Sequence, residues 1–275
     1  MTMLAHNNES LVMGILNVTP DSFSDGGHYF SVEMAAQRAS QMVSEGADII
    51  DVGGESSRPG SEPVRIDEEL KRVIPVIETI RKSLSVPVSI DTTKPEVADA
   101  ALSAGASIIN DVSMLRYGTP LAQVAAKHDA TLILMHSRGT PKNMHNASEY
   151  TDIAVEVRNE LLAAVSKAMH VGVSSENIWL DPGIGFAKTA EQSMELIARL
   201  KVLVDSGYPV LSGPSRKSFI GHFTGTEIDN RLGGTAAAVA ISIYNGAAAV
   251  RVHDIGVMKQ VAAISSRLRA AMGNQ

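Results

Sequence analysis

The sequence predicts an α/β fold of one class, a single (β/α)8 TIM barrel in which eight parallel strands form a ring inside a ring of helices. The chain has 275 residues, and a barrel of this type takes about 250. Short apolar segments alternate with longer amphipathic segments from one end to the other. Because no linker-like change of composition divides the chain, residues 1–275 are expected to form one domain, with a polar extension at residues 1–10.

The expected strands are short, apolar and rich in β-branched residues. They are Val12–Val18, Asp48–Gly53, Val86–Asp91, Ser107–Val112, Thr131–His136, Asn177–Asp181, Pro209–Gly213 and Ala248–His253. Nearly continuous apolar character indicates strands that are covered on both faces, as in a parallel sheet. Between them, apolar residues at spacings of three and four predict helices, for example at Met34–Glu45, Asp67–Leu84 and Glu149–His170. An open doubly wound sheet has a similar pattern, but eight repeats within this length favour closure.

The composition excludes several classes of protein. The net charge is −6 and aromatic residues make up 4% of the chain, which argues against a nucleic-acid partner. The chain has no cysteine, so a disulfide framework, a thiolate zinc site and a cysteine nucleophile are excluded. No apolar run reaches the roughly 18 residues of a membrane span, and the first residues do not resemble a signal peptide. We therefore expect a cytoplasmic protein with no membrane partner.

Polar residues gather where the expected strands end. They are Asn17, Glu55, Asp91, Asn110, Asp111, His136, Asp181, Ser215, Arg251 and His253. In a barrel these ends share one rim, where active sites are built. A cap for the following helix explains any single Asp, Asn or Ser about equally well. Capping does not explain Arg251 and His253 in the last segment, so the set as a whole predicts a functional site.

Several motifs follow one another along the chain. They are Gly14–Gly27 (GILNVTPDSFSDGG), Asp51–Gly60 (DVGGESSRPG), Ile90–Pro95 (IDTTKP), Ile109–Asp111 (IND), Leu134–His136 (LMH), Leu180–Phe186 (LDPGIGF), Ser215–Ser218 (SRKS) and Arg251–Asp254 (RVHD). Together they resemble the dihydropteroate synthase family over essentially the whole chain. Ser57 stands where members often have Thr, and Ala187 where a third Gly is common. Neither difference removes a functional group.

The resemblance implies a transferase of folate biosynthesis. Such an enzyme condenses 6-hydroxymethyl-7,8-dihydropterin pyrophosphate with p-aminobenzoate and releases 7,8-dihydropteroate and pyrophosphate. It also implies small-molecule partners, a homodimer, a Mg²⁺ cofactor and competition between sulfonamides and the aryl amine. Loss of pyrophosphate from the pterin, followed by attack of the amine, is the mechanism that the resemblance supports. Asp91, Lys217, Arg251 and His253 are then the expected catalytic residues.

The pterin is a flat ring system with parallel N–H donors beside a carbonyl. Carboxylates can accept such bonds, each contributing about 1.5–3 kcal/mol. By resemblance the pterin residues are Asp91, Asn110, Met135, Asp181, Phe186 and Lys217. Two simpler interpretations stay open: Asp91 as a cap for a helix that begins at Pro95, and Asp181 as a turn residue before Pro182.

The pyrophosphate needs positive charge. Arg251 and His253 are two residues apart on the last expected strand, so they face the same side and can form an anion site. The alternative for Arg251 is a surface ion pair with Asp254. By resemblance Asn17 also faces the pyrophosphate and is the protein ligand of Mg²⁺, which binds phosphate oxygens and few protein oxygens.

The second substrate carries an amine and a carboxylate. By resemblance its pocket is formed by Phe23, Ser57, Arg58, Pro59 and Ser215. The segment from Ser215 to Ser218 also precedes an expected helix, whose free N–H groups suit a carboxylate. Asp21 and Asp25 flank Phe23, and turn formation explains them as well as catalysis does.

Three other functions were weighed. A methyltetrahydrofolate-binding domain of a corrinoid methyltransferase would share the acidic floor but would not need the cations at the rim. A non-catalytic pterin-binding barrel would not need Lys217, Arg251 and His253. A metal-dependent aldolase would need two or three His or carboxylate ligands together, whereas only His136 and His253 fall at strand ends. A Schiff base on Lys217 is disfavoured because Lys217 lies between Arg216 and Ser218 at a helix start.

Overall fold

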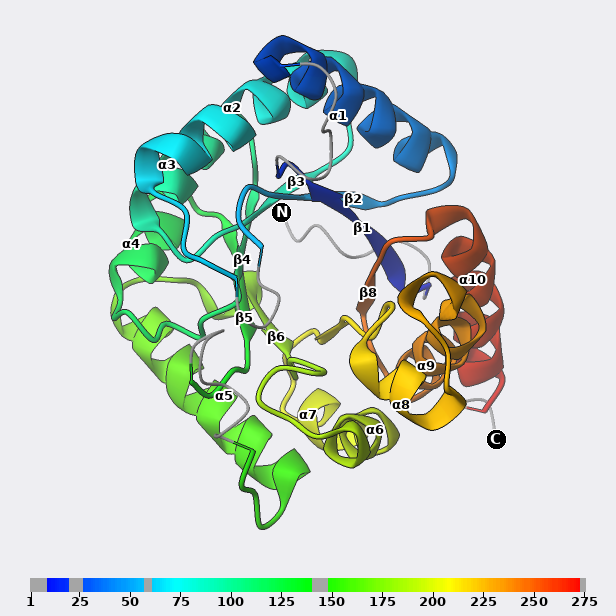
Figure 1. Cartoon of the computed structure of the whole chain (residues 1–275). Helices are drawn as coiled ribbons and strands as arrows, with labels where there is room; N and C mark the ends of the chain where they lie inside the picture. Colours follow the sequence, from blue (N-terminus) through cyan, green and yellow to red (C-terminus); the bar gives the residue numbers. More distant parts are fainter. Residues whose placement is uncertain (1–8, 20–26, 57–60, 140–147, 273–275) are drawn as a thin grey trace.

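The computed structural model describes residues 9–19, 27–56, 61–139 and 148–272, with side chains from residue 32 onward in the first helix. Its strands are β1 (Leu11–Asn17), β2 (Ile49–Gly53), β3 (Val88–Asp91), β4 (Ile108–Asp111), β5 (Thr131–Met135), β6 (Ile178–Asp181), β7 (Leu211–Ser212) and β8 (Ala249–Val252). Their order in the sheet is β6-β5-β4-β3-β2-β1-β8-β7, and every pairing is parallel. A parallel bridge between Leu180 and Val210 joins the two end strands. The predicted barrel is therefore confirmed (Figure 1).

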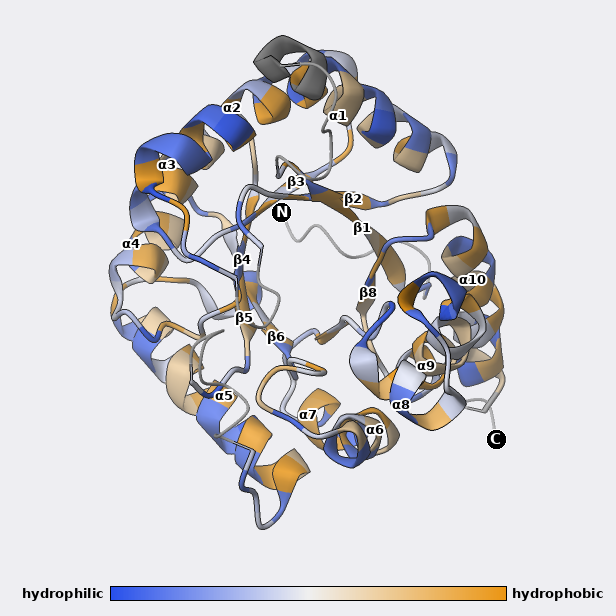
Figure 2. Ribbon diagram, viewed as in Figure 1, coloured by the Kyte–Doolittle hydropathy of each residue, from blue (hydrophilic) through white to orange (hydrophobic). Residues whose placement is uncertain are grey.

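Helices surround the ring of strands (Figure 1). They are α1 (Gly27–Ser44), α2 (Ile66–Ser83), α3 (Pro95–Ser103), α4 (Pro120–Lys127), α5 (Ile153–His170), α6 (Ala190–Ala198), α7 (Lys201–Val204), α8 (Ser218–Thr224), α9 (Leu232–Tyr244) and α10 (Ile255–Met272). Short 3-10 turns lie at Ser175–Asn177 and Ile228–Asn230. In Figure 2 the strands are mostly apolar, whereas the helices carry both apolar and hydrophilic residues. No helix among the described residues is long and apolar enough to cross a bilayer.

Side chains alternate between the two faces of each strand. Those that point inward fill the barrel, and the last of them lie at the candidate site. One set of strand residues, including Val12, Ile50 and Leu132, packs outward in the main hydrophobic core. The other set points inward and forms an apolar layer of Met13, Ile49, Ile108, Ile133, Trp179, Leu211 and Ala249. Burial of each large side chain of this layer favours folding by about 1.5–3 kcal/mol.

A second layer, polar except for Met135, lies one step further along the same inward face. Because successive strand side chains alternate, the next inward residue is two positions later. It is Asp51 after Ile49, Asn110 after Ile108, Met135 after Ile133, Asp181 after Trp179 and Arg251 after Ala249. The apolar layer thus lies beneath a mostly polar layer at the carboxyl ends of the strands, and we call this end of the barrel the rim.

Candidate active site

Four residues from four strands form one network at the bottom of the rim. Arg251 Nε donates a hydrogen bond to Asp51 Oδ2 at 2.6 Å, and Arg251 Nη2 donates to Asp91 Oδ2 at 2.8 Å. Asn110 Nδ2 donates to Asp51 Oδ2 at 3.1 Å. Asp51, Asn110 and Asp91 are buried. Arg251 is therefore held by two carboxylates, and β2, β3, β4 and β8 are joined through their side chains.

Two acceptor atoms of this network have no hydrogen-bond partner among the described residues. They are Asp51 Oδ1 and Asn110 Oδ1, and both are buried. A buried acceptor without a partner costs about 1–3 kcal/mol. A ligand that brings N–H donors to the bottom of the rim would remove that cost.

Asp181 and Lys217 lie close to this network, where the charges of Lys217 and Arg251 act on the Asp181 carboxyl group. Asp181 Oδ1 accepts a hydrogen bond from Gly183 N at 2.7 Å. A Cβ atom built on Gly213 would lie 3.8 Å from Arg251 Cβ and 4.0 Å from Asp181 Oδ2, so these two side chains flank the same glycine. The Lys217 ammonium lies 3.9 Å from the centre of the Phe186 ring. Gly185 makes room for this lysine, since a Cβ there would be 3.3 Å from Lys217 Cδ.

Burial raises the pKa of two carboxyl groups at the rim, those of Asp91 and Asp181. It raises the pKa of Asp91 to about 7, against the opposing effect of Arg251. It raises the pKa of Asp181 to about 6, against the hydrogen bond from Gly183 and the charge of Lys217. Shifts of this kind are typical of functional sites, although structural ion pairs also produce them. Both groups titrate close to neutral pH.

His253 and Ser215 form a second pair at the rim. The His253 backbone N–H donates to Ser215 Oγ at 3.2 Å, and Ser215 Oγ lies 2.9 Å from His253 Nδ1. Burial, with the charge of Arg251, lowers the pKa of His253 to about 4. The imidazole is therefore neutral at pH 7, and Ser215 Oγ can either donate to its Nδ1 or accept from it. In the free protein the rim has one cation and one neutral donor here, and not the two cations that the residue types suggested.

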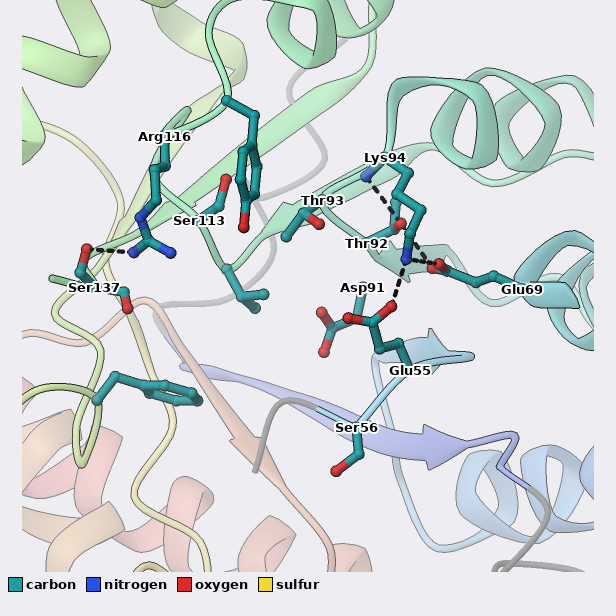
Figure 3. Close-up of a pocket in the computed structure, with 13 residues that line it drawn as sticks. Glu55, Ser56, Glu69, Asp91, Thr92, Thr93, Lys94, Ser113, Arg116 and Ser137 are labelled. Atoms are coloured by element: carbon teal, nitrogen blue, oxygen red, sulfur yellow. Dashed lines mark hydrogen bonds and ion pairs between the residues drawn. The ribbon is translucent and has the colours of Figure 1, made fainter. Parts of the chain in front are cut away.

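A cavity of about 70 Å³ opens beside Asp91 and Phe186. On one side Lys94 lies between Glu55 and Glu69, and on the other Arg116 donates to the Ser137 carbonyl at 2.8 Å (Figure 3). Lys94 Nζ is 2.5 Å from Glu55 Oε2 and also contacts the buried Glu69. Asp91, one carboxyl group of the strand network, thus faces a space that is open to a small molecule.

Comparison with known proteins agrees with this geometry. The family model described as "pterin binding enzyme" matches residues 13–253. A dihydropteroate synthase of Synechocystis is 48% identical over 268 residues, which cover 97% of this chain and 93% of the relative. The chain belongs to the dihydropteroate synthase family. The family assignment made from the motifs is confirmed.

Solved structures of the family have the same fold. The structure of dihydropteroate synthase from Clostridium difficile in the presence of pteroic acid has a TM-score of 0.89 and 44% identity, covering 94% of this chain and 97% of that one. The Xanthomonas albilineans enzyme with 4-aminobenzoic acid also has a TM-score of 0.89, with 41% identity, covering 95% of this chain and 94% of that one.

The structure decides between some of the simpler interpretations of dihydropteroate synthase motifs. Asp91 does not cap α3, because the residue that precedes this helix is Lys94 and no side chain bonds there. The alternative pair of Arg251 with Asp254 is not formed, since Asp254 accepts two hydrogen bonds from Arg216, at 3.0 and 2.6 Å. Asp181 does form the expected turn contact with Gly183, and it also flanks Gly213 together with Arg251.

The expected dihydropteroate synthase residues fall into four groups. Asp91, Asn110, Asp181, Phe186, Lys217, Arg251, His253 and Ser215 lie together at the rim through the contacts given above. Met135 is buried at the end of β5 and is aligned with Asp181 of β6. Asn17 is exposed at the end of β1, and a Cβ on Gly53 would lie 3.8 Å from both Asn17 Oδ1 and Asp91 Oδ2. Phe23, Ser57, Arg58, Pro59, Asp21 and Asp25 lie outside the described residues.

Sequence reasoning missed two residues. Asp51 was seen only as part of a motif, although its position two residues after the inward-facing Ile49 was the signal that places it in the site. Lys188 is the second, with its Nζ 3.0 Å from Nδ1 of His136, which the sequence placed only at a strand end. Lys188 and His136 are 52 positions apart, and no local pattern connects them.

Proposed function

We propose that this chain is a dihydropteroate synthase that joins a dihydropterin pyrophosphate to p-aminobenzoate. The observation that carries the proposal is the cluster at the rim, where buried acceptors at the bottom lie beside Arg251 and Lys217. Family membership supports the same activity, as do the relatives solved with pteroic acid and with 4-aminobenzoic acid.

The acceptors match the hydrogen-bonding edge of a pterin. Asp181 and Asp91 would accept N–H bonds from the amino group and ring nitrogens, and the amide of Asn110 can both accept and donate. Asn110 Oδ1 and Asp51 Oδ1 have no partner in the described part of the free protein, which fits a donor-rich ligand or ordered water. Met135, Phe186 and the stem of Lys217 would contact the ring faces. Asp51 is a new member of this set and acts by orienting Asn110 and Arg251.

The pyrophosphate would lie at the outer edge of the same cavity. Arg251, His253 and Asn17 are its proposed contacts. Arg251 would supply positive charge, and His253 would supply an Nε2–H donor in the tautomer whose Nδ1 accepts from the Ser215 hydroxyl. These donors would stabilise the negative charge that develops as the C–O bond breaks.

Asn17 is the proposed protein ligand of Mg²⁺. Within the described residues no three His, Asp or Glu side chains are arranged to hold a metal ion by themselves. Asn17 has an exposed amide oxygen at the end of β1, and Mg²⁺ commonly binds one or two protein oxygens together with substrate phosphates. The residues therefore fit a Mg²⁺ ion that enters with the pyrophosphate, and when bound it would neutralise phosphate charge.

The proposed reaction forms no covalent bond between the protein and either substrate. The bond between the pterin methylene carbon and the pyrophosphate oxygen breaks, and the electron pair leaves with pyrophosphate. The aryl amine forms the new C–N bond and loses one proton to solvent or to a nearby base. The residues of the rim hold the two reactants in line and stabilise charge. Asp91, Lys217, Arg251 and His253 are the proposed catalytic residues.

The aryl amine would bind above the pterin. Its proposed contacts are Phe23, Ser57, Arg58, Pro59 and Ser215. Ser215 is buried against His253 and so lies next to the pyrophosphate contacts. Sulfonamides, which share the aryl amine and an acidic group, are expected to compete with p-aminobenzoate in steady-state kinetics. Mixed or absent competition would contradict this pocket.

Two further parts of the proposal concern the oligomeric state and the subcellular location. We propose a homodimer through α9 and α10, where Ile241, Tyr244, Ile264 and Leu268 are exposed while the opposite face of α9 packs inward. Ile264→Glu with Leu268→Glu should then convert a dimer to a monomer in light scattering. We also propose that the enzyme works in the cytoplasm, which cell fractionation tests.

The activity is tested by following pyrophosphate release with the pterin pyrophosphate, p-aminobenzoate and Mg²⁺. Release that depends on the amine supports the synthase. Arg251→Ala should weaken binding of the pterin pyrophosphate more than binding of bare hydroxymethylpterin, whereas Arg158→Ala on the exposed side of α5 is the control. A methyltetrahydrofolate-binding barrel would bind the reduced folate and show no amine-dependent release, and that result would overturn the proposal.

A further inference from the structure

Lys188 lies beside the site and has no part in the proposed reaction. It lies near the end of the loop from β6 to α6, and its side-chain nitrogen contacts the backbone of that loop. Lys188 Nζ donates a hydrogen bond to the Phe186 carbonyl oxygen at 2.8 Å and lies 3.0 Å from His136 Nδ1. Burial lowers the pKa of Lys188 to about 7, against the attraction of Asp181. Burial of a lysine amine costs free energy, which the interactions of Lys188 with the loop offset.

The loop from Gly183 to Lys188 has a backbone that requires support. Gly183, Gly185 and Ala187 have φ values of 65°, 80° and 50°. A left-handed conformation costs a non-glycine residue about 1–2 kcal/mol, so Ala187 holds it only because its surroundings impose it. The Tyr150 hydroxyl donates to the Ala187 carbonyl at 3.2 Å, and Lys188 fixes the preceding carbonyl, that of Phe186.

His136 anchors the ammonium to the barrel. The Glu160 carboxylate can only accept, so His136 has its ring proton on Nε2 and its Nδ1 accepts from Lys188 Nζ. Nε2 in turn lies 3.1 Å from Glu160 Oε2, which also contacts Arg138. Burial, with the charge of Lys188, lowers the pKa of His136 to about 4, so the ring stays neutral. The chain of contacts runs from α5 through β5 to the loop.

This series of contacts is connected to the candidate site by the ring of Phe186. The Phe186 ring lies 3.9 Å from the Lys217 ammonium, and Phe186 lines the cavity beside Asp91. The position of the ring depends on the backbone of Phe186, whose carbonyl is the group that Lys188 holds.

We propose that Lys188 is a positioning residue of the pterin site, which holds Phe186 in the place where its ring contacts Lys217 and forms one wall for the pterin. This inference rests on the proposed function, because it assumes that a pterin binds against Phe186. The alternative is that Lys188 stabilises the loop without any effect on ligand binding.

A double-mutant cycle separates the two roles. The four proteins are wild type, Lys188→Met, Phe186→Ala and the double variant, and the measurement is calorimetric binding of 6-hydroxymethylpterin. Lys188→Met should raise the Kd about tenfold in the wild-type background, equivalent to about 1.4 kcal/mol. In the Phe186→Ala background the same change should raise it less than about twofold, because a residue that acts through Phe186 has no effect once the ring is absent.

The controls exclude a loss of fold. Lys201→Met, in an exposed pair with Asp205, should leave the Kd unchanged. A merely structural role of Lys188 would lower the binding stoichiometry and the melting temperature while the Kd of the folded fraction stayed the same. Lys188→Arg keeps a donor and should restore most of the affinity. If Lys188→Met does not fold, Lys188→Gln takes its place in the cycle.

Two results would overturn the inference: an unchanged Kd for Lys188→Met, or the same increase in both backgrounds. The proposed function is tested separately by the turnover of wild type. A wild-type protein that binds hydroxymethylpterin without amine-dependent pyrophosphate release would refute the synthase activity and leave the cycle interpretable. A wild-type protein that does not bind the pterin would refute both.

Discussion

Replacement of Asp51 by Asn tests the network at the bottom of the rim with almost no change of shape. Asp51 Oδ2 accepts one bond from Arg251 Nε at 2.6 Å and one from Asn110 Nδ2 at 3.1 Å. A hydrogen bond to a charged group contributes about 1.5–3 kcal/mol, and a neutral one about 0.5–1.5 kcal/mol. The loss of charge at both bonds should therefore lower the free energy of unfolding by about 2–3 kcal/mol. Removal of the whole group in Asp51→Ala should cost about 3–5 kcal/mol, because Arg251 would lose a buried partner.

The same change should alter the titration of Asp91. The negative charge of Asp51 raises the pKa of Asp91, so Asp51→Asn should lower that pKa from about 7. The pH below which hydroxymethylpterin binding weakens should then move to a lower value. Affinity at neutral pH should nevertheless fall, since Arg251 and Asn110 lose the group that orients them.

Urea unfolding followed by tryptophan fluorescence is a direct assay, because the single tryptophan, Trp179, lies in the inward apolar layer. Asp205→Asn, in an exposed pair on α7, is the matched control and should change stability by less than about 0.5 kcal/mol. If Asp51→Asn unfolds at the same urea concentration as wild type and binds hydroxymethylpterin equally well, the network does not have the role given to it here.

Three further predictions concern charge, backbone and capping. Asp91 and Asp181 have raised pKa values, about 7 and 6, so hydroxymethylpterin affinity should fall as the pH is lowered from 7 to 5, by up to about tenfold per unit for each proton. The effect on the free energy of unfolding goes the other way. Because folding favours the protonated form of both groups, the stability that they contribute is present at low pH and is lost as the pH rises through these values. Urea unfolding at acid and at neutral pH would show this difference. Gly183→Ala should lower the free energy of unfolding by about 3 kcal/mol or more, because its Cβ would lie 1.9 Å from the His136 carbonyl oxygen. Gly207→Ala also has a positive φ but has open space around it, so it should lower the free energy of unfolding by only about 1–2 kcal/mol. Equal melting temperatures of the two variants would contradict this. Thr189→Ala removes the capping box of α6 and should cost about 1 kcal/mol in urea unfolding, with no effect on the Kd for the pterin.

The strands were predictable because their alternation with helices follows from burial on both faces. The seventh strand was overestimated: Pro209–Gly213 was expected, whereas β7 is only Leu211–Ser212 with a bridge at Val210. Pro209 has no N–H to donate and Gly213 has no side chain to pack, so the ends of this segment pair poorly. Short α7 and the 3-10 turns carry no sequence pattern long enough to predict them.

The site was predictable where polar residues end a strand and less so where they lie within one. Asp91, Asn110 and Asp181 are last or next to last in their strands, whereas Asp51 lies in the middle of β2 and looks like an interruption of it. Partners were not predictable, because Arg251 and Asp51 are 200 positions apart and their pairing depends on closure of the barrel. The charge of His253 depends on burial, which residue type alone does not give.

The bridge between Leu180 and Val210 has a consequence for the motion of the barrel. Leu180 N donates to the Pro209 carbonyl at 2.9 Å, and the short β7 offers little further backbone pairing to β6 among the described residues. This weakest seam runs between the strand that carries Asp181 and the segment that leads to Lys217. A pterin that contacts both of these residues would stabilise the pairing between β6 and the β7 segment. Substrate should therefore slow amide exchange at Leu180 more than in the fully paired strands opposite.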